Sequence, residues 1–225
     1  MNIILFGPPG AGKGTQAENI IKDFNLTKIS TGDLLRKEIS RKTDLGNKIS
    51  SIIDKGSLVS DEIINKLIID ILSNKNFYNR LIFDGYPRNL SQAKNLDTLV
   101  KKHNQKISCV ISLNVDKDII IKRILGRQTC TKCGLIFNKY FNPATEKNHS
   151  CDKKFLDTRS DDNKKTITNR YDTYISKTLP ILDFYKEQNL LHQIDGTLHI
   201  SEIYKQIQGI INSLEAWHYE SYLYK

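Results

Sequence analysis

The chain has 225 residues, of which 39% are hydrophobic and 26% are charged. This balance excludes an intrinsically disordered chain and suits one globular unit with room for a small inserted module. The formal net charge of +9 favours anionic partners, but the basic residues are spread along the chain, so charge alone does not choose between nucleotides and nucleic acid.

Residues 1–6 are mostly apolar and lack a basic leader, so we expect no signal peptide. Membrane-spanning helices need roughly 18 consecutive apolar residues, and no run in the sequence approaches that length. We therefore expect a cytoplasmic protein without a membrane partner.

Apolar segments typical of buried strands occur at 3–6, 81–83 and 109–115. Between and after them, apolar residues recur every three or four positions. This spacing predicts helices over 15–24, 33–41, 44–54, 61–73, 90–102, 117–126, 162–188 and 200–215. Strands that alternate with helices indicate an α/β fold with a parallel sheet covered on both faces.

Two segments interrupt this alternation. Residues 30–60 have helical spacing and no strand of their own, which indicates a small helical flap. Residues 128–161 contain three cysteines and the β-like piece 135–137, which indicates an inserted hairpin module.

The first strand runs into Gly-Pro-Pro-Gly-Ala-Gly-Lys-Gly-Thr at residues 7–15. This is the phosphate-binding P-loop pattern, except that Gly14 stands at the usual Ser/Thr position and Thr15 follows it. A glycine-rich loop between a strand and a helix directs backbone N–H groups and the positive helix end at phosphate oxygens. Lys13 supplies an ammonium for the β- and γ-phosphates, and Thr15 a hydroxyl near the phosphates or a metal.

A second motif, Asp-Gly-Tyr-Pro-Arg at residues 84–88, follows the strand at 81–83. Asp84 ends that strand, where its carboxylate can bind Mg²⁺ through water beside the P-loop. Gly85 and Pro87 shape the backbone so that the Arg88 guanidinium can make a forked contact with a phosphate.

These two motifs, G-x-P-G-x-G-K-G-T and D-G-[FY]-P-R-x-x-x-Q, resemble the adenylate kinase family. The resemblance continues in four further segments and covers nearly the whole chain. They are 30–36, 56–61, 123–127 and 158–162, the last with Arg170. It implies a P-loop three-layer fold of the long-lid bacterial type and reversible transfer of the ATP γ-phosphoryl group to AMP, giving two ADP. It also implies a monomer of nucleotide biosynthesis.

The resemblance implies three domains. The core would comprise 1–29, 60–126 and 165–225, the nucleoside monophosphate-binding domain 30–59, and the lid 127–164.

The resemblance also implies a role for each matched residue. ATP would contact Gly10, Ala11, Gly12, Lys13, Gly14, Thr15, Arg127, Ile136 and Phe137. AMP would contact Thr31, Arg36, Ser57, Leu58, Val59, Gly85, Tyr86, Pro87, Arg88, Gln92, Arg159 and Arg170. The catalytic cations would be Lys13, Arg88, Arg123, Arg127, Arg159 and Arg170, with Mg²⁺ bound through water at Asp84.

The chemistry independently favours this set of residues, because phosphoryl transfer mainly requires positioning and neutralisation of spread-out negative charge. The Thr31 hydroxyl and the Gln92 amide can read an adenine edge, which favours AMP over UMP, CMP or GMP. Asp161 and Asp162 have two open interpretations: they orient arginines or join the two flaps, or they stabilise the start of a helix.

Cys130, Cys133 and Cys151 form a C-x₂-C-x₁₇-C pattern. In a reducing compartment this pattern is typical of structural zinc, which takes four ligands. Lys154 stands where a second C-x₂-C pair would end, so the fourth ligand stays open among His149, Asp152 and Asp157. The alternative is a decayed site with three free thiols.

A different class of function also fits the charge: a nucleotide-gated protein that binds nucleic acid through the cysteine segment. The motif at 84–88 and the arginines at 123 and 127 have no task in such a protein. The cysteine segment also lacks the interleaved aromatic and basic residues that stack on bases. The sequence therefore favours the kinase and no nucleic-acid partner.

Overall fold

The structure, a computed structural model, describes residues 1–74 and 78–223, with side chains as far as Glu215. Its centre is a parallel sheet of five strands in the order β2-β3-β1-β4-β8. The strands are β2 (Thr27–Ser30), β3 (Leu81–Asp84), β1 (Asn2–Phe6), β4 (Ile107–Asn114) and β8 (Leu191–Asp195). The predicted α/β class and parallel sheet are confirmed, and the two edge strands β2 and β8 were not predicted.

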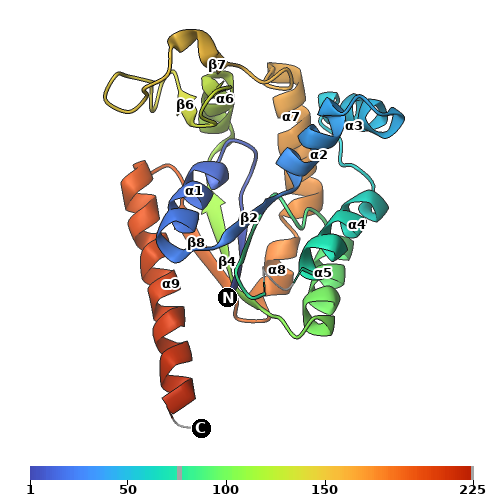
Figure 1. Cartoon of the computed structure of the whole chain (residues 1–225), viewed down its shortest axis with the longest axis vertical. Coiled ribbons are helices and arrows are strands. Elements are labelled where there is room, and N and C mark those ends of the chain that lie inside the picture. Colours follow the sequence, from blue (N-terminus) through green and yellow to red (C-terminus); the bar gives the residue numbers. More distant parts are fainter. Residues whose placement is uncertain (75–77, 224–225) are drawn as a thin grey trace.

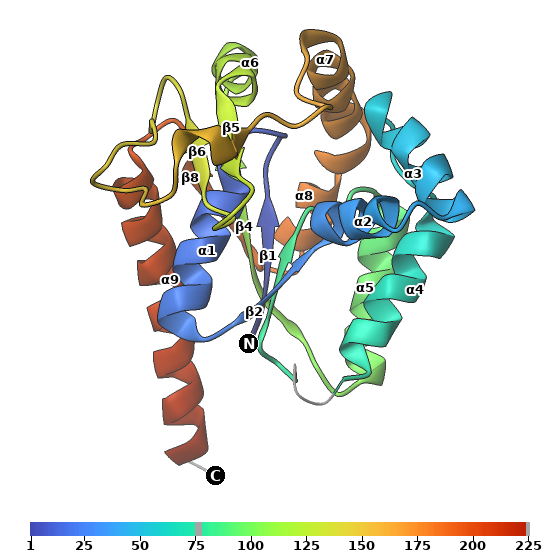
Figure 2. The ribbon, with the colours of Figure 1, turned by 45° about the horizontal axis from the view of Figure 1, so that its top comes forward.

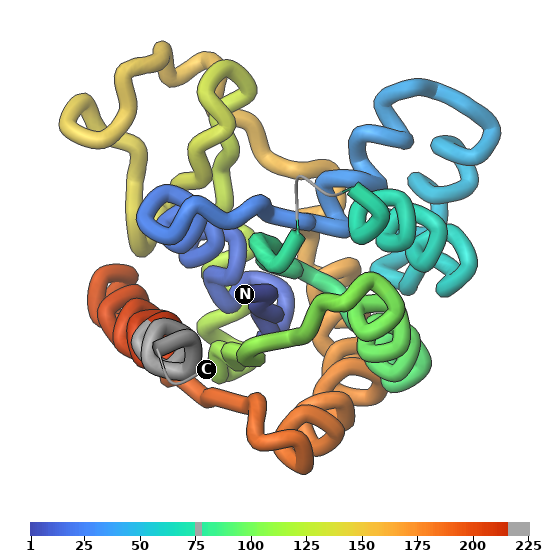
Figure 3. Tube along the Cα trace, turned by 60° about the horizontal axis from the view of Figure 1, so that its bottom comes forward, coloured from blue at the N-terminus to red at the C-terminus, as the bar shows by residue number. Residues whose placement is uncertain are grey.

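Alternate residues of β1 face opposite sides of the sheet, as the pleat of a strand requires. Ile4 and Phe6 pack with α4 (Asp61–Leu72), α5 (Leu90–Lys102) and α8 (Ile181–Lys186). Ile3 and Leu5 pack with α1 (Lys13–Phe24) and α9 (Ile200–Leu223). Figure 3 shows these helices on the two sides of the sheet, with the start of β1 between them. β1, β3 and β4 are buried on both faces, which is why their sequences are continuous apolar runs.

The flap predicted at 30–60 contains two short helices, α2 (Thr31–Ser40) and α3 (Asp44–Asp54). Each begins at a hydroxyl cap: the Ser30 Oγ accepts the Asp33 N–H at 3.2 Å, and the Thr43 Oγ1 accepts the Gly46 N–H at 3.0 Å. The pair extends from one side of the sheet (Figure 1).

The cysteine segment follows α6 (Lys117–Leu125) and is larger than the predicted hairpin. Its antiparallel sheet has three strands in the order β6-β5-β7. They are β5 (Arg127–Cys130), β6 (Ile136–Asn138) and β7 (Leu156–Asp157), with a 3-10 turn at Lys153–Phe155. Figure 2 shows this small sheet and the α2–α3 pair on opposite sides of the upper end of the central sheet.

The single helix predicted over 162–188 is wrong. The structure has α7 (Lys164–Thr173), a π-helical turn at Tyr174–Thr178 and then α8. The physical reason is Pro180, which has no N–H to donate and whose ring clashes with the preceding helical turn. The helix widens to a π-helical turn before the proline. There the Leu179 N–H donates to the carbonyl of Tyr174, five residues earlier, at 2.8 Å.

A buried amide network joins the strands at their amino ends, opposite the loops after each strand. Asn2 Nδ2 donates to Gln105 Oε1 at 3.0 Å, and Asn2 Oδ1 accepts the Leu81 N–H at 3.1 Å. The same Gln105 oxygen accepts the Asn79 N–H at 3.1 Å. β1, β3 and the start of β4 are thus connected by neutral side chains as well as by the sheet ladder.

Candidate active site

A cavity of about 580 Å³ opens at the carboxyl ends of the parallel strands. Ligands of open α/β sheets bind at this end, because the loops that follow the strands converge there. Its walls come from the P-loop, the α2–α3 pair, the loops after β3 and β8, the lid strands and α7.

The P-loop ends in a backbone conformation that favours glycine: Gly12, which precedes α1, has φ of +99°. Lys13 is the first residue of α1, and its Nζ donates to the carbonyls of Gly7 at 2.8 Å and Pro8 at 2.9 Å. The pKa of Lys13 is lowered to about 8, mainly by burial; the Asp84 carboxylate opposes this shift, and Arg88 and Arg127 add to it. The ammonium therefore lies across its own loop, poorly solvated.

Asp84 and a lid residue lie beside the P-loop. A Cβ placed on Gly14 would be 3.8 Å from both Asp84 Oδ2 and Ile136 Cδ1. The carboxylate at the end of β3 thus faces the start of α1, and β6 brings an apolar side chain over the same loop. Arg123 also contacts the loop, since its Nη1 donates to the Ala11 carbonyl at 3.3 Å.

Asp161 and Asp162 orient two of the arginines. Asp162 has a buried carboxylate that accepts Arg127 Nε at 2.8 Å and also pairs with Arg127 Nη2. Asp161 accepts a hydrogen bond from Arg170 Nη2. α7 has Asn163 as its N-cap residue, so of the two interpretations that the sequence left open, orientation of arginines is the one that these contacts support.

The cavity concentrates positive charge. Eight Lys and Arg side chains line it against two Asp, among the residues that the structure describes. The cations are Lys13, Lys28, Arg36, Arg88, Arg123, Arg127, Arg159 and Arg170. Burial and then neighbouring Arg127 and Arg36 lower the pKa of Arg159 to about 10, while burial and Arg170 lower the pKa of Arg88. Cations crowded in this way are stabilised by a polyanion that replaces the lost water.

Most predicted nucleotide contacts line this one cavity, including all of 10–15 and 57–59. Three do not: Thr31, Tyr86 and Gln92 are buried directly behind the wall. The Thr31 hydroxyl donates to the Gly85 carbonyl at 2.8 Å, and the Gln92 carbonyl oxygen accepts the Arg88 N–H at 2.7 Å. Each of these bonds links the side chain to the loop after β3.

The sequence missed two groups that line the cavity. The loop between β8 and α9 contributes Thr197, Leu198 and His199, and the lid loop contributes Phe141 and Asn142. The first group could have been found by placing β8, because a loop that follows a parallel strand lies at this end of the sheet. The second follows β6 and carries no motif.

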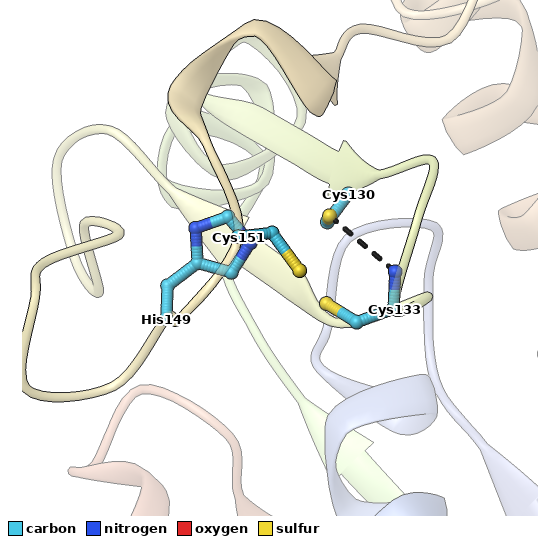
Figure 4. Close-up of side chains that lie close together, drawn as sticks. All are labelled: Cys130, Cys133, His149 and Cys151. Atoms are coloured by element: carbon cyan, nitrogen blue, oxygen red, sulfur yellow. Dashed lines mark hydrogen bonds between the residues drawn. The ribbon is translucent and has the colours of Figure 1, made fainter.

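The predicted metal residues come together in the lid (Figure 4). Ligand atoms of Cys130, Cys133, Cys151 and His149 all lie within 4.8 Å of one another. The His149 Nε2 is buried and has no hydrogen-bond partner. Asp152, the acidic candidate nearest in sequence, lies outside this group, and its Oδ1 accepts the Lys154 N–H at 2.9 Å.

Comparisons with known proteins agree with this geometry. The family model described as adenylate kinase matches residues 5–190. The chain is 50% identical to the adenylate kinase of Pelagibacter ubique over 211 residues, covering 94% of this chain and 99% of that one. It is 43% identical to the enzyme of Enterococcus faecalis over 94% of this chain and 99% of the other. For Archaeoglobus fulgidus the identity is 38% over 96% of this chain and all of the relative. The chain belongs to the adenylate kinase family.

Proposed function

We propose that the protein catalyses reversible transfer of the ATP γ-phosphoryl group to AMP, giving two ADP. One observation carries this proposal: a single cavity joins the P-loop and Lys13 to Arg36, Arg88 and the backbone of 57–59. The P-loop and Lys13 suit a nucleoside triphosphate, and the region of Arg36, Arg88 and 57–59 suits a monophosphate. Two nucleotides can therefore meet in this cavity with their phosphates end to end. Family membership supports the same activity.

On the donor side, residues 10–15 bind the ATP phosphates through backbone N–H groups and the Lys13 ammonium. Arg123 and Arg127 neutralise charge on the transferring group. Ile136 and Phe137 of the lid contact the adenosine. When phosphate binds, the Lys13 ammonium exchanges its contacts with the Gly7 and Pro8 carbonyls for contacts with phosphate oxygens.

On the acceptor side, Arg36 and Arg88 bind the AMP phosphate, and Arg159 and Arg170 contact both nucleotides. An oxygen of the AMP phosphate attacks the γ-phosphorus in line, and the bond between that phosphorus and the β–γ bridging oxygen breaks. The released electron pair goes to ADP. Positioned cations stabilise the charge spread over the transferring group, so no covalent intermediate is needed.

Asp84 is the residue that would hold the Mg²⁺ of the ATP complex, through water. Oxygen ligands and retained waters are what Mg²⁺ prefers, and Asp84 Oδ2 lies beside Gly14 at the phosphate loop. The ion supplies further neutralisation of the phosphates.

We assign three domains to these tasks. The core is 1–29, 60–126 and 165–225, the AMP-binding domain is 30–59, and the lid is 127–164. In support, residues of all three line the one cavity.

A coupled assay that follows ADP tests the activity, with ATP, Mg²⁺ and each of AMP, GMP, UMP and CMP. We expect turnover with AMP far above the others. Lys13→Met and Arg88→Ala should each lower kcat/KM by about a hundredfold or more, as expected for the loss of one positioned charge. If none of the four monophosphates gives ADP, the proposal is overturned. Circular dichroism of both variants checks that their fold is intact.

We also propose that the lid binds one structural Zn²⁺ through Cys130, Cys133, Cys151 and His149. Three thiols and one imidazole are a usual donor set for closed zinc sites. The orphaned, buried His149 Nε2 supports the fourth ligand, because such a nitrogen is costly unless it has a partner. A tetrahedral site requires sulfurs roughly 3.8 Å apart, so atoms within 4.8 Å of one another need only small shifts.

Metal analysis after purification without chelator tests the site. We expect one zinc per chain, a lower content with His149→Ala, and an unchanged content with Asp152→Ala, the matched control. Full retention of zinc by His149→Ala would contradict the ligand assignment, and so would loss of zinc from Asp152→Ala.

The remaining proposals concern state and location: a cytoplasmic monomer, without nucleic-acid or membrane partners. In the part of the chain that the structure describes, no helix has the length and apolar character needed to cross a bilayer. Light scattering with size-exclusion chromatography tests the monomer.

A further inference from the structure

Asp61 has two hydrogen bonds that tie it to the loop and helix following β3. It is the first residue of α4, and its Oδ1 accepts Gln92 Nε2 at 2.7 Å and Asn89 Nδ2 at 2.9 Å. Asn89 is in turn the N-cap of α5 and accepts the Gln92 N–H at 2.8 Å. Asp61, which directly follows the flap at 30–60, thus contacts the side chain of Gln92, one of the residues predicted to bind AMP.

These contacts allow one orientation of the Gln92 amide. Its nitrogen donates to the Asp61 carboxylate, which can only accept, and its oxygen accepts the Arg88 N–H at 2.7 Å, which can only donate. If the Gln92 amide were flipped, its oxygen would face the Asp61 carboxylate and its NH₂ group would face the Arg88 N–H, and both contacts would be repulsive. Gln92 is 2% exposed, so water cannot relieve either contact.

The two contacts use one N–H and one oxygen lone pair of the Gln92 amide, so one of each remains on this side chain, directly behind the part of the cavity wall that Gly85 and Arg88 form. Adenine presents the complement, an acceptor at N1 and a donor at its 6-amino group. A 6-oxo purine such as hypoxanthine presents the opposite pair, a donor at N1 and an acceptor at O6.

We propose that Asp61 is a specificity-determining positioning residue, which holds the Gln92 amide in the orientation that accepts a 6-amino purine and rejects a 6-oxo purine. The proposal rests on the proposed function, in which AMP is the phosphoryl acceptor, and on the expectation from the sequence that the Gln92 amide reads the adenine edge. Arg88 acts in the same direction through its backbone, so its N–H continues to favour this orientation when Asp61 is changed.

The test is Asp61→Asn, because an amide at position 61 can either accept from Gln92 nitrogen or donate to Gln92 oxygen. The flipped state then loses one of its two repulsive contacts. We expect the ratio of kcat/KM for AMP to that for IMP to fall about tenfold, as for a hydrogen bond to a charged group. The change should appear in the KM for AMP, with the KM for ATP unchanged.

Glu62→Gln is the matched control, since Glu62 is exposed in the same first turn of α4 and its loss changes the helix end by the same charge. It should leave the AMP to IMP ratio at the wild-type value. An unchanged ratio in Asp61→Asn, or an equal loss for AMP, IMP and ATP, overturns the positioning role.

A measurement on the unmodified protein is independent of any variant's folding. Purine riboside monophosphate keeps the N1 acceptor and lacks a 6-substituent, so the order of kcat/KM should be AMP, then purine riboside monophosphate, then IMP. A higher value for IMP than for purine riboside monophosphate overturns the fixed orientation. Absence of ADP formation from AMP in the wild type would instead overturn the proposed function itself.

Discussion

At the scale of single residues, Lys13 shows how burial changes the properties of a charge. Its ammonium contacts two carbonyls and has Asp84 as its compensating charge, while Arg88 and Arg127 oppose its protonation. Burial is the largest cause of its lowered pKa, about 8 against the ordinary 10.5. A cation in this state is still protonated at neutral pH and gains more from a phosphate than a hydrated lysine does.

This pKa predicts a pH dependence of ATP capture. Below about pH 8 the amine is protonated and attracts phosphate, and above that pH the charge is lost, so kcat/KM for ATP should fall as pH rises through the pKa of the free enzyme. The profile of kcat should fall at higher pH, because bound phosphate raises the pKa of Lys13. Phosphate groups have a second pKa of about 6, so the nucleotides do not change charge in this range. A level kcat/KM between pH 7 and 10 would contradict the assignment.

Among the elements, α7 contacts the end of α3, in the segment that we assign to AMP. Thr166 Oγ1 donates to the Asp54 carbonyl at 2.9 Å, and Asn169 Nδ2 donates to the Lys55 carbonyl at 3.3 Å. Gly56 has φ of +74°, and a Cβ there would lie 3.0 Å from the Thr166 carbonyl. The turn that begins the 57–59 segment is therefore packed directly against the helix that carries Arg170.

Thr166→Val should weaken AMP binding more than ATP binding. The substitution keeps the side-chain shape and removes the donor to the Asp54 carbonyl, a loss of about 1 kcal/mol that corresponds to a roughly fivefold higher KM for AMP. Steady-state kinetics with each nucleotide varied in turn measures this.

Thr168→Val is the control for that experiment, because the Thr168 hydroxyl donates to the Lys164 carbonyl within α7 itself, at 3.0 Å. Its KM values should stay at the wild-type level. Equal changes in both variants, or a change confined to ATP, would show that the link between α7 and the flap does not position AMP.

The elements also show what sequence could and could not predict. β1, β3 and β4 are buried on both faces and were predicted, whereas β2 and β8 lie at the edges with mixed polarity and were missed. Pro180 indicated the break before α8, but the helical spacing of apolar residues led to the prediction of one helix over 162–188. The P-loop and the arginines were predicted from motifs. Whether His149 or an acid joins the cysteines was not predictable, because it depends on how the loop between β6 and β7 folds back.

In the molecule as a whole, the two ends of the central sheet differ in charge: one end carries crowded cations and the other carries buried neutral amides. Mutually repelling cations line the cavity at the carboxyl ends, where the lid and the α2–α3 pair also lie. At the amino ends, Asn2 and Gln105 join neighbouring strands through buried, neutral amides. Substrate-dependent rearrangement is therefore expected at one end alone.

Amide hydrogen exchange checks this difference. On addition of AMP with a non-hydrolysable ATP analogue, amides of 55–59 and of the lid strands should exchange more slowly, because the nucleotides order the segments that contact them. The N–H of Leu81, which donates to Asn2, should exchange at the same slow rate in both states. Protection that appears equally at both ends would contradict the separation.

The amide network has a consequence for how the molecule responds to its ionic surroundings. Dissolved ions screen the attraction between guanidinium groups and phosphates, but they have little to screen between neutral amides that are shut away from solvent. Rising ionic strength should thus cost the enzyme its nucleotides well before it costs the sheet its strand alignment.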